Sequence, residues 1–188
     1  SGFALSVTYP SAGNLGGGGF MVIRLANGQV VTNDHREKAP ILATKDMYLD
    51  ANAEVIAGLS TRSHLAAGVP GTVAGLIDVL EEFGTMPLAD VIQPAIDLAS
   101  EGFLIPEDLA RQFESRIKDF SPYKASMGVF TKEGAPYQAG DLFIQSDLSR
   151  TLSRIKQLGK KGFYDGETAE QIVQEMERGG GLISKEDL

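Results

Sequence analysis

Two short apolar runs near the start of the chain are separated by a turn signal. The first, Phe20 to Leu25, is followed by Asn27-Gly28, and the second, Gln29 to Thr32, contains three β-branched residues. Two β-prone runs on either side of Asn-Gly are a strong local signal for a β-hairpin, because both residues tolerate the positive φ that a tight turn needs. The sequence therefore predicts a hairpin whose second strand leads into the charged segment Asp34 to Lys38.

From His64 onward, apolar residues recur at the three- and four-residue spacing of amphipathic helices. Prolines mark the beginnings of several of these patterns and glycines mark ends, as the fixed φ of proline and the freedom of glycine favour. Pro94 lies inside the second pattern and should kink that helix or remove a hydrogen bond. The five predicted helices begin with Pro70 in a first turn, at Pro87, at Pro106, at Ser146 as the N-cap, and at about Thr168, the last running to Arg178.

The remaining segments have weaker patterns. Met47 to Asp50 is predicted as a short strand, and Ala51 to Ala57 as a turn and strand. Phe120 to Asp141 contains scattered prolines and glycines, so we expect a long irregular segment with a short strand near Met127 to Thr131. A hairpin followed by helices indicates an α+β fold, with residues 1–62 as the hairpin segment and residues 63–188 as a mainly helical lobe.

The composition indicates a folded acidic chain. Apolar residues make up 43% of the 188 residues, and the net charge is −8. No basic run exists to neutralise phosphates, which argues against nucleic acid as a partner. The absence of cysteine excludes disulfides, thiolate catalysis and cysteine-based zinc sites. No apolar run approaches the roughly 20 residues of a membrane-spanning helix, so no membrane insertion is expected.

Both ends of the sequence have the character of interior segments. Residues 1–9 are apolar and uncharged in their side chains, unlike the polar ends of most domains. Ser184 is followed three residues later by Asp187, a variant of the capping box that begins a helix. We therefore expect this chain to be a piece of a longer protein, truncated at both ends.

Most sequence motifs for chemistry are absent. The glycine run Gly16–Gly19 fits neither the dinucleotide-binding nor the P-loop pattern, and no G-x-S-x-G segment occurs. His35 and His64 lack the spacing of a metal-binding helix, so both are interpreted as structural or surface residues and no metal site is expected. A glycine run lets either another backbone or a ligand come very close, and the sequence leaves both interpretations open.

Arg36 is the remaining candidate for binding chemistry. A guanidinium can hold a carboxylate through two parallel hydrogen bonds, which lysine cannot reproduce. The alternative is an ion pair with Asp34 or Glu37, and the local pattern alone favours it. The residues by themselves therefore indicate a folded domain with a candidate carboxylate-binding arginine beside a glycine run.

Four segments resemble the large subunit of γ-glutamyltranspeptidase: AGNLGGGGFMVIR, REKAP, HLAAGVPGTVAGL and GGLISKEDL, in this order over essentially the whole chain. The resemblance implies part of an Ntn-hydrolase αββα fold, made from one precursor that cuts itself into two subunits. It also implies transfer or hydrolysis of the γ-glutamyl group of glutathione and related compounds, with an amino acid, a peptide or water as acceptor. No cofactor is expected, and the implied location is periplasmic or secreted.

The resemblance also assigns roles to residues. It places the nucleophile outside this chain, at the threonine that begins the small subunit and whose own α-amino group can act as base. Residues 1–188 alone are therefore expected to be inactive. The family's R-E-x-A-P motif implies that Arg36 binds the substrate α-carboxylate, with Glu37 as a partner that orients it. His35 stands where the family pattern has Phe or Tyr, which puts the donor preference in doubt.

Two alternatives to this function stay open. The parent protein could be a non-catalytic binding or scaffold relative that kept the fold. It could also be an acylase of the same superfamily that removes glutaryl-type groups, because the residues that would choose between these substrates lie outside the chain.

Overall fold

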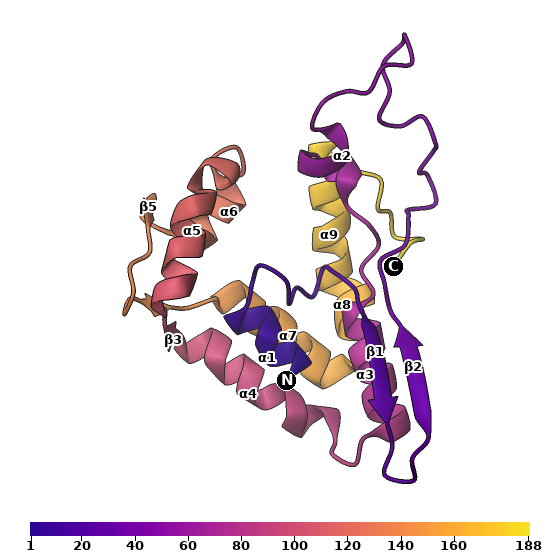
Figure 1. The fold of residues 1–188 in the computed structure, drawn as a ribbon, viewed down its shortest axis with the longest axis vertical. Coiled ribbons are helices and arrows are strands. Elements are labelled where there is room, and N and C mark those ends of the chain that lie inside the picture. The colour runs from indigo at the N-terminus through magenta and orange to yellow at the C-terminus, as the bar shows by residue number, and fades with distance from the viewer.

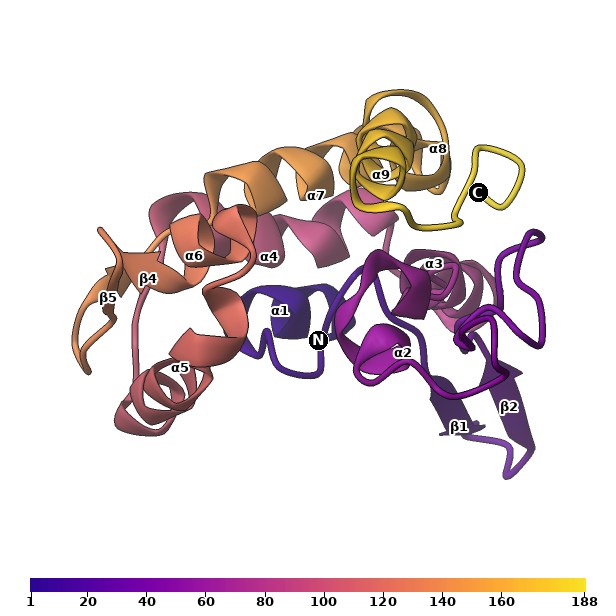
Figure 2. The same ribbon diagram turned by 90° about the horizontal axis from the view of Figure 1, so that it is seen from above.

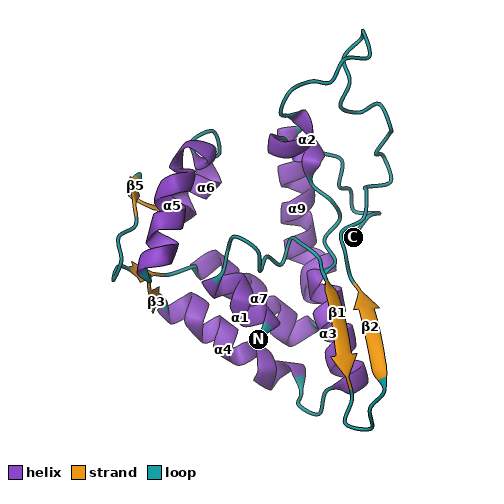
Figure 3. Ribbon diagram, in the orientation of Figure 1, coloured by secondary structure: helices purple, strands orange, loops and turns teal.

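Helices dominate the structure, a computed structural model that describes residues 1–188 (Figure 3). The helices are α1 (Gly2–Thr8), α2 (Leu59–Arg62), the 3₁₀-helix η1 (His64–Ala66), α3 (Thr72–Phe83), α4 (Leu88–Glu101), α5 (Glu107–Phe120), α6 (Lys124–Phe130), α7 (Ser146–Leu158), α8 (Lys161–Tyr164) and α9 (Gly166–Gly179). The strands are β1 (Phe20–Arg24), β2 (Val30–Asp34), β3 (Phe103–Leu104), β4 (Thr131–Lys132), β5 (Ala135–Pro136) and β6 (Leu142–Phe143), paired as β1–β2, β3–β6 and β4–β5. None of the helices is long and apolar enough to span a membrane.

The predicted hairpin is confirmed. Strands β1 and β2 are antiparallel, with a register that runs from Phe20 opposite Asp34 to Arg24 opposite Val30. Gly28 in the connecting turn has a φ of +87°, the conformation for which the Asn-Gly signal selects. The hairpin lies beside α3 at one end of the molecule (Figure 1).

The five predicted helices are confirmed as α3, α4, α5, α7 and α9, with small differences at their starts. Helix α4 lies between Pro87 and Gly102 and contains Pro94, as predicted. Pro70, predicted to lie in a first turn, is outside α3, because Gly71 is the N-cap and Thr72 the first helical residue. Ser146, predicted as an N-cap, is the first residue of α7 itself.

The strand predicted near Met127 to Thr131 is wrong, because most of this segment forms helix α6. The side chain of Thr131 donates a hydrogen bond of 2.5 Å to the carbonyl of Met127, one turn earlier, which closes the end of the helix. Only Thr131 and Lys132 are extended, and they pair with β5 across a tight turn at Glu133-Gly134. Both turn residues have positive φ (54° and 88°), as a type I′ turn requires.

The strands predicted over Met47 to Asp50 and within Ala51 to Ala57 are also wrong. The only ladder contact there is an isolated bridge between Leu49 and Val55. The carboxylate of Asp50 accepts hydrogen bonds from the backbone N–H groups of Asn52 (2.8 Å) and Glu54 (2.9 Å). These local bonds hold the segment as a turn, because they occupy donors that a strand ladder would need.

Helix α1 was not predicted, because its seven residues are too few for a clear helical period, and the side chain of its N-cap, Ser1, forms no capping hydrogen bond. It is held by burial instead: Phe3 and Val7 are 6% and 0% exposed and lie in the main core cluster. The side chain of Gln145 donates a 2.8 Å hydrogen bond to the carbonyl of Val7, near the end of this helix. Tertiary packing therefore determines this element rather than local propensity.

The main core lies where α1, α3, α4, α7 and α8 meet (Figure 2). Its fully buried members come from distant parts of the chain and include Val7, Ile77, Ile92, Leu152 and Ile155. A second, smaller cluster surrounds Phe113 and Phe143, whose rings are 5.4 Å apart in an edge-on arrangement. Figure 1 shows the result, with α5 and α6 on one side and the hairpin on the other.

Candidate functional site

The glycine run lies against the end of strand β2 and the beginning of helix α3. Gly19 and His35 exchange two backbone hydrogen bonds, of 3.0 and 3.3 Å. The carbonyl of Gly17 accepts hydrogen bonds from the N–H groups of Gly71 (2.9 Å) and Thr72 (3.0 Å). These donors belong to the start of α3, where N–H groups lack partners within the helix. The run therefore connects the hairpin to the helix.

Close backbone packing explains part of the glycine run. A methyl group at Gly18 would lie 2.6 Å from both the N atom of Glu37 and the O atom of His35, too close for any residue with a Cβ. Gly17 has more room, and a methyl group there would lie 3.5 Å from the Glu37 carboxylate. At Gly18, therefore, the glycine is needed for close backbone packing rather than for the approach of a ligand.

Arg36 is exposed and lines a cavity of about 310 Å³. The cavity lies between the end of β2, the start of α3 and Tyr164. The guanidinium forms no ion pair, so the predicted alternative, a pair with Asp34 or Glu37, does not occur. Asp34 instead accepts a 3.0 Å hydrogen bond from the backbone N–H of Arg36. The cationic group is thus free to meet an anion from solution.

Glu37 and His35 surround Arg36 without pairing with it. Glu37 lines a neighbouring cavity of about 300 Å³, beside Gly17 and Gly18. The His35 ring packs between Gly19 and Gly75, and its Nδ1 atom lies 2.7 Å from Oδ1 of Asn33. His35 lines both cavities, so it forms the wall between the two charged neighbours.

Tyr164 closes one side of the Arg36 cavity and was not singled out by the sequence. Its hydroxyl donates a 3.0 Å hydrogen bond to the carbonyl of Pro70 and accepts one of 3.1 Å from the N–H of Ala74. Burial raises the pKa of Tyr164 above its ordinary value. No local pattern could have identified it, because its partners lie about 90 residues earlier in the chain.

The last predicted motif also reaches this region. The carboxylate of Asp187 accepts hydrogen bonds from the backbone N–H (2.8 Å) and hydroxyl (2.9 Å) of Ser184, in a turn with the spacing of the capping box. The same carboxylate accepts a 2.7 Å bond from the N–H of Ile41, just after the REKAP segment. Two of the motifs quoted above are therefore adjacent in space.

The second histidine is not part of this arrangement. Nε2 of His64 lies 2.8 Å from the carboxylate of Glu175, and the ring packs against Gly179. His64 lines a separate cavity of about 640 Å³ between η1 and the end of α5, which contains neither Arg36 nor the glycine run. The structure has no group of three or more histidine, aspartate or glutamate side chains placed to hold a metal ion.

Comparison with known proteins gives consistent matches along the chain. The family model described as gamma-glutamyltranspeptidase matches residues 1–188. A glutathione hydrolase proenzyme from Escherichia coli (strain K12) is 48% identical over 188 residues, which are 100% of this chain and 32% of that protein. The acylase ACY 1 proenzyme from Pseudomonas sp. (strain V22) is 35% identical over 192 residues, covering 99% of this chain and 34% of that protein.

A solved structure agrees with the sequence matches. The crystal structure of Helicobacter pylori gamma-glutamyltranspeptidase superposes with a TM-score of 0.97 at 51% identity, over 99% of this chain and 54% of that chain. The fold is therefore that of the corresponding part of this relative. This chain spans about a third of the length of the curated relatives that it matches.

Proposed function

Because the chain belongs to the gamma-glutamyltranspeptidase family, we propose that it is the large-subunit part of an enzyme that transfers or hydrolyses γ-glutamyl groups. The α+β fold is part of the Ntn-hydrolase architecture, with the hairpin of residues 1–62 contributing to its sheet and residues 63–188 forming the helical lobe. The substrates are glutathione and related γ-glutamyl compounds. The single observation that carries the role of this chain is the unpaired Arg36 guanidinium in its cavity.

The chemistry is divided between two polypeptides. The small subunit, a separate part of the same precursor that self-cleavage releases, supplies an amino-terminal threonine as nucleophile. Its hydroxyl attacks the γ-carbonyl of the donor, the amine leaves with a proton, and a γ-glutamyl ester remains on the threonine. Water or the amino group of an acceptor then takes the γ-glutamyl group and regenerates the hydroxyl. Residues 1–188 bind the donor and take no part in bond breaking.

Arg36 holds the α-carboxylate of the donor. An arginine with no internal carboxylate partner needs to break no ion pair before it binds one from the substrate, and two parallel hydrogen bonds fix the orientation of the bound group. Glu37 is proposed to orient Arg36, although the two form no ion pair in the structure. Substitution Glu37→Gln tests that role separately.

The substitution Arg36→Ala in the full-length protein tests the proposal. Losing a charge-assisted contact should weaken transition-state binding of the donor by about 1.5–3 kcal/mol, seen as a fall in kcat/KM for γ-glutamyl-p-nitroanilide. Arg111→Ala is the matched control, because Arg111 is an exposed residue of α5, on the side of the molecule opposite the hairpin (Figure 1), and its ion pair is with Glu107 of the same helix. Equal kinetics of the two variants would remove Arg36 from the donor site.

The similarity to an acylase proenzyme supports a second candidate, an acylase, for which we propose glutaryl-type groups as the substrate. A glutaryl donor carries the same carboxylate as a γ-glutamyl donor and lacks only the α-amino group, so Arg36 would serve both. Comparing kcat/KM for glutaryl- and γ-glutamyl-p-nitroanilide separates the two functions. A strong preference for the glutaryl compound would establish the acylase.

We propose a periplasmic or secreted location for the parent protein, based on family membership. Fractionation of cells that express the full-length protein tests this, and recovery only with cytoplasmic markers would contradict it. Mass measurement of the same protein before and after incubation tests self-cleavage, because the masses of the two fragments must sum to that of the precursor plus one water molecule.

A further inference from the structure

The backbone around Arg36 is held on both sides by neighbouring segments. Before it, His35 exchanges two backbone hydrogen bonds with Gly19, and after it, Lys38 exchanges two with Val69, of 2.8 and 3.2 Å. These backbone hydrogen bonds fix the chain at His35 and at Lys38. They do not fix the orientation of the peptide groups between these two residues. The backbone N–H of Arg36 belongs to that intervening stretch.

The donor of Arg36 is bound by a side chain rather than by another strand. Oδ1 of Asp34 lies 3.0 Å from the N atom of Arg36, two residues further on. This is the hydrogen bond of an Asx turn, in which a side-chain oxygen replaces the carbonyl of a backbone turn. It forms where β2 ends, so it determines how the chain leaves the strand.

Asp34 acts on the backbone of Arg36 and leaves its guanidinium alone. Neither Asp34 nor any other carboxylate forms an ion pair with that guanidinium. An aspartate two residues from an arginine could neutralise it, and that contact would compete with an anionic substrate. The observed bond avoids this competition while it restricts the backbone from which the side chain extends.

We propose that Asp34 is a positioning residue for Arg36. It holds the backbone of the arginine in the conformation that binds the donor, so that less conformational entropy is lost when the donor binds. This inference rests on the proposed function of Arg36. Pre-organisation of this kind improves ground-state and transition-state binding alike. What the role requires at position 34 is an oxygen acceptor at this distance from the Arg36 N–H, and the negative charge is not required.

The proposal gives an ordered series of variants in the full-length protein. Asp34→Asn keeps the acceptor oxygen, Asp34→Ser keeps a weaker one, and Asp34→Ala removes it. We expect KM for γ-glutamyl-p-nitroanilide to rise about three- to tenfold in Asp34→Ala, the range for loss of one hydrogen bond, with kcat within about twofold. Asp34→Asn should match the parent protein, and Asp34→Ser should lie between.

A donor without the α-carboxylate separates positioning of Arg36 from general damage to the fold. 4-Aminobutyryl-p-nitroanilide lacks the group that Arg36 binds, so Asp34→Ala should leave its kcat/KM unchanged relative to the parent. Equal losses for both donors would assign Asp34 a purely structural role and overturn the proposal. Loss in Asp34→Asn as large as in Asp34→Ala would show that the charge matters, and would also overturn it.

The variant Arg36→Ala distinguishes the failure of this inference from failure of the proposed function. If Arg36→Ala loses donor binding while Asp34→Ala retains it, only the positioning role is wrong. If Arg36→Ala has the kinetics of the parent, Arg36 is not a donor contact and both proposals are wrong. Melting temperatures of all variants, measured in parallel, should lie within a few degrees of the parent.

Discussion

Individual glycines determine how closely the Arg36 segment approaches helix α3. The His35 ring lies directly over Gly75, and the carbonyl of His35 lies over Gly71, so a Cβ at either position would overlap it. The segment HLAAGVPGTVAGL places both glycines at the start of α3, four residues apart and therefore on one face. Because neither glycine has a side chain, the residue that follows strand β2, His35, can pack directly against the backbone of helix α3.

Gly75→Ala should destabilise the full-length protein by about 1–3 kcal/mol, the range for overpacking, in spite of the higher helix propensity of alanine. The added methyl group would collide with the His35 ring. Gly128→Ala is the matched control, because Gly128 also lies in a helix, α6, and a methyl group there meets no atom within 4 Å. The control should be stabilised by about 0.5–1 kcal/mol.

Urea unfolding of the two variants measures both changes. If Gly75→Ala is as stable as Gly128→Ala, the close approach of His35 to α3 is not a feature of the protein in solution. The structural basis for the wall between the two cavities would then be lost.

The residues of the candidate site were only partly accessible from the sequence. Arg36 was identified through its motif, but the choice between an ion pair and a free guanidinium needed the three-dimensional positions of Asp34 and Glu37. Asp34 itself was considered only as an ion-pair partner, although its spacing two residues before Arg36 is that of an Asx turn. Tyr164 had no local signal, because its hydrogen bonds join α8 to the distant start of α3.

Among the secondary-structure elements, those with signals at both ends were predictable. Helix α4 has Pro87 before it and Gly102, with φ of +82°, after it, and its apolar face has the helical period. The turn of the hairpin was predictable for the same reason, because Asn27-Gly28 can adopt the positive φ that a tight turn requires. Local chemistry determines these boundaries, so sequence patterns find them.

Elements held by distant contacts were not predictable. Helix α1 depends on the burial of Phe3 and Val7 among residues of α4 and α7. Those helices lie far along the chain, so the sequence around α1 does not reveal the contacts that hold it. In α6, the β-branched Val129 and the aromatic Phe130 have β propensity, but the structure forms a helix packed beside α5. Tertiary packing overrides weak local propensity in both cases.

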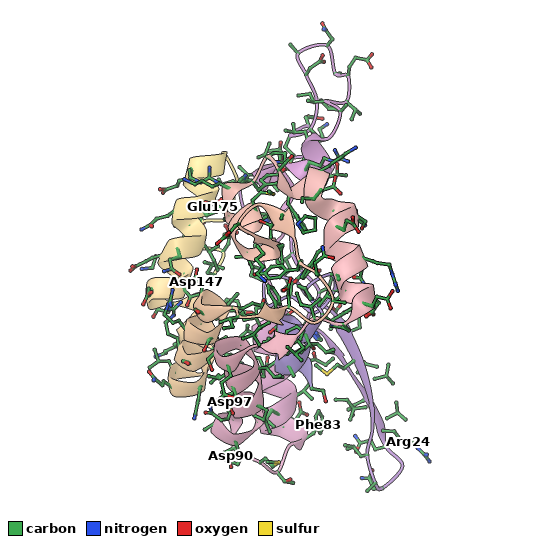
Figure 4. The ribbon with its side chains drawn as sticks, turned by 90° about the vertical axis from the view of Figure 1, so that its left-hand side faces the viewer. Arg24, Phe83, Asp90, Asp97, Asp147 and Glu175 are labelled. Atoms are coloured by element: carbon green, nitrogen blue, oxygen red, sulfur yellow. The ribbon has the colours of Figure 1, made fainter.

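Glu175 links two elements that lie far apart in the sequence, and the link should depend on pH. Glu175 lies on helix α9 (Figure 4). It accepts hydrogen bonds from Arg178 of the same helix and lies 2.8 Å from His64 of η1. Arg178 and then His64 lower the pKa of Glu175 from 4.5 to about 2. A carboxylate with a lowered pKa in the folded state stabilises it above the unfolded pKa, and this stabilisation disappears as the pH falls through the folded pKa.

Glu175→Gln should therefore be less stable than the parent at pH 5 to 7, and the difference should shrink between about pH 4.5 and 2. The side chain is 46% exposed, so solvent screening keeps the difference modest. Glu170→Gln is the control, because Glu170 is an exposed residue of the same helix that forms no ion pair. Urea midpoints of the three proteins across this range provide the measurement. A constant difference between Glu175→Gln and the parent would contradict the link.

At the scale of the whole molecule, the hairpin has one covered face and one bare face. Met21, Ile23 and Val31 are half-buried, whereas Phe20, Val22 and Val30 on the opposite face are 64%, 76% and 58% exposed. The same face also carries Arg24, Thr32 and Asp34, so it is mixed rather than purely apolar. An isolated two-stranded sheet is marginally stable in water, and three large apolar side chains exposed on one face indicate a contact surface. The matched relatives are about three times as long as this chain, and we expect another part of such a polypeptide to cover this face.

Val22→Lys in the full-length protein should impair the association of the two polypeptides that we propose arise from the precursor. Removing a valine from an apolar contact loses about 1.5–3 kcal/mol, and burying an unpaired charge in its place adds to that loss. Leu158→Lys is the matched control: Leu158 is 60% exposed at the last residue of α7, where a lysine suits the helix dipole. Size-exclusion chromatography of the purified proteins should show less two-subunit complex for Val22→Lys only. Because both substitutions exchange an exposed aliphatic residue for the same cation, equal amounts of complex would mean that the bare face of the hairpin faces solvent in the mature protein.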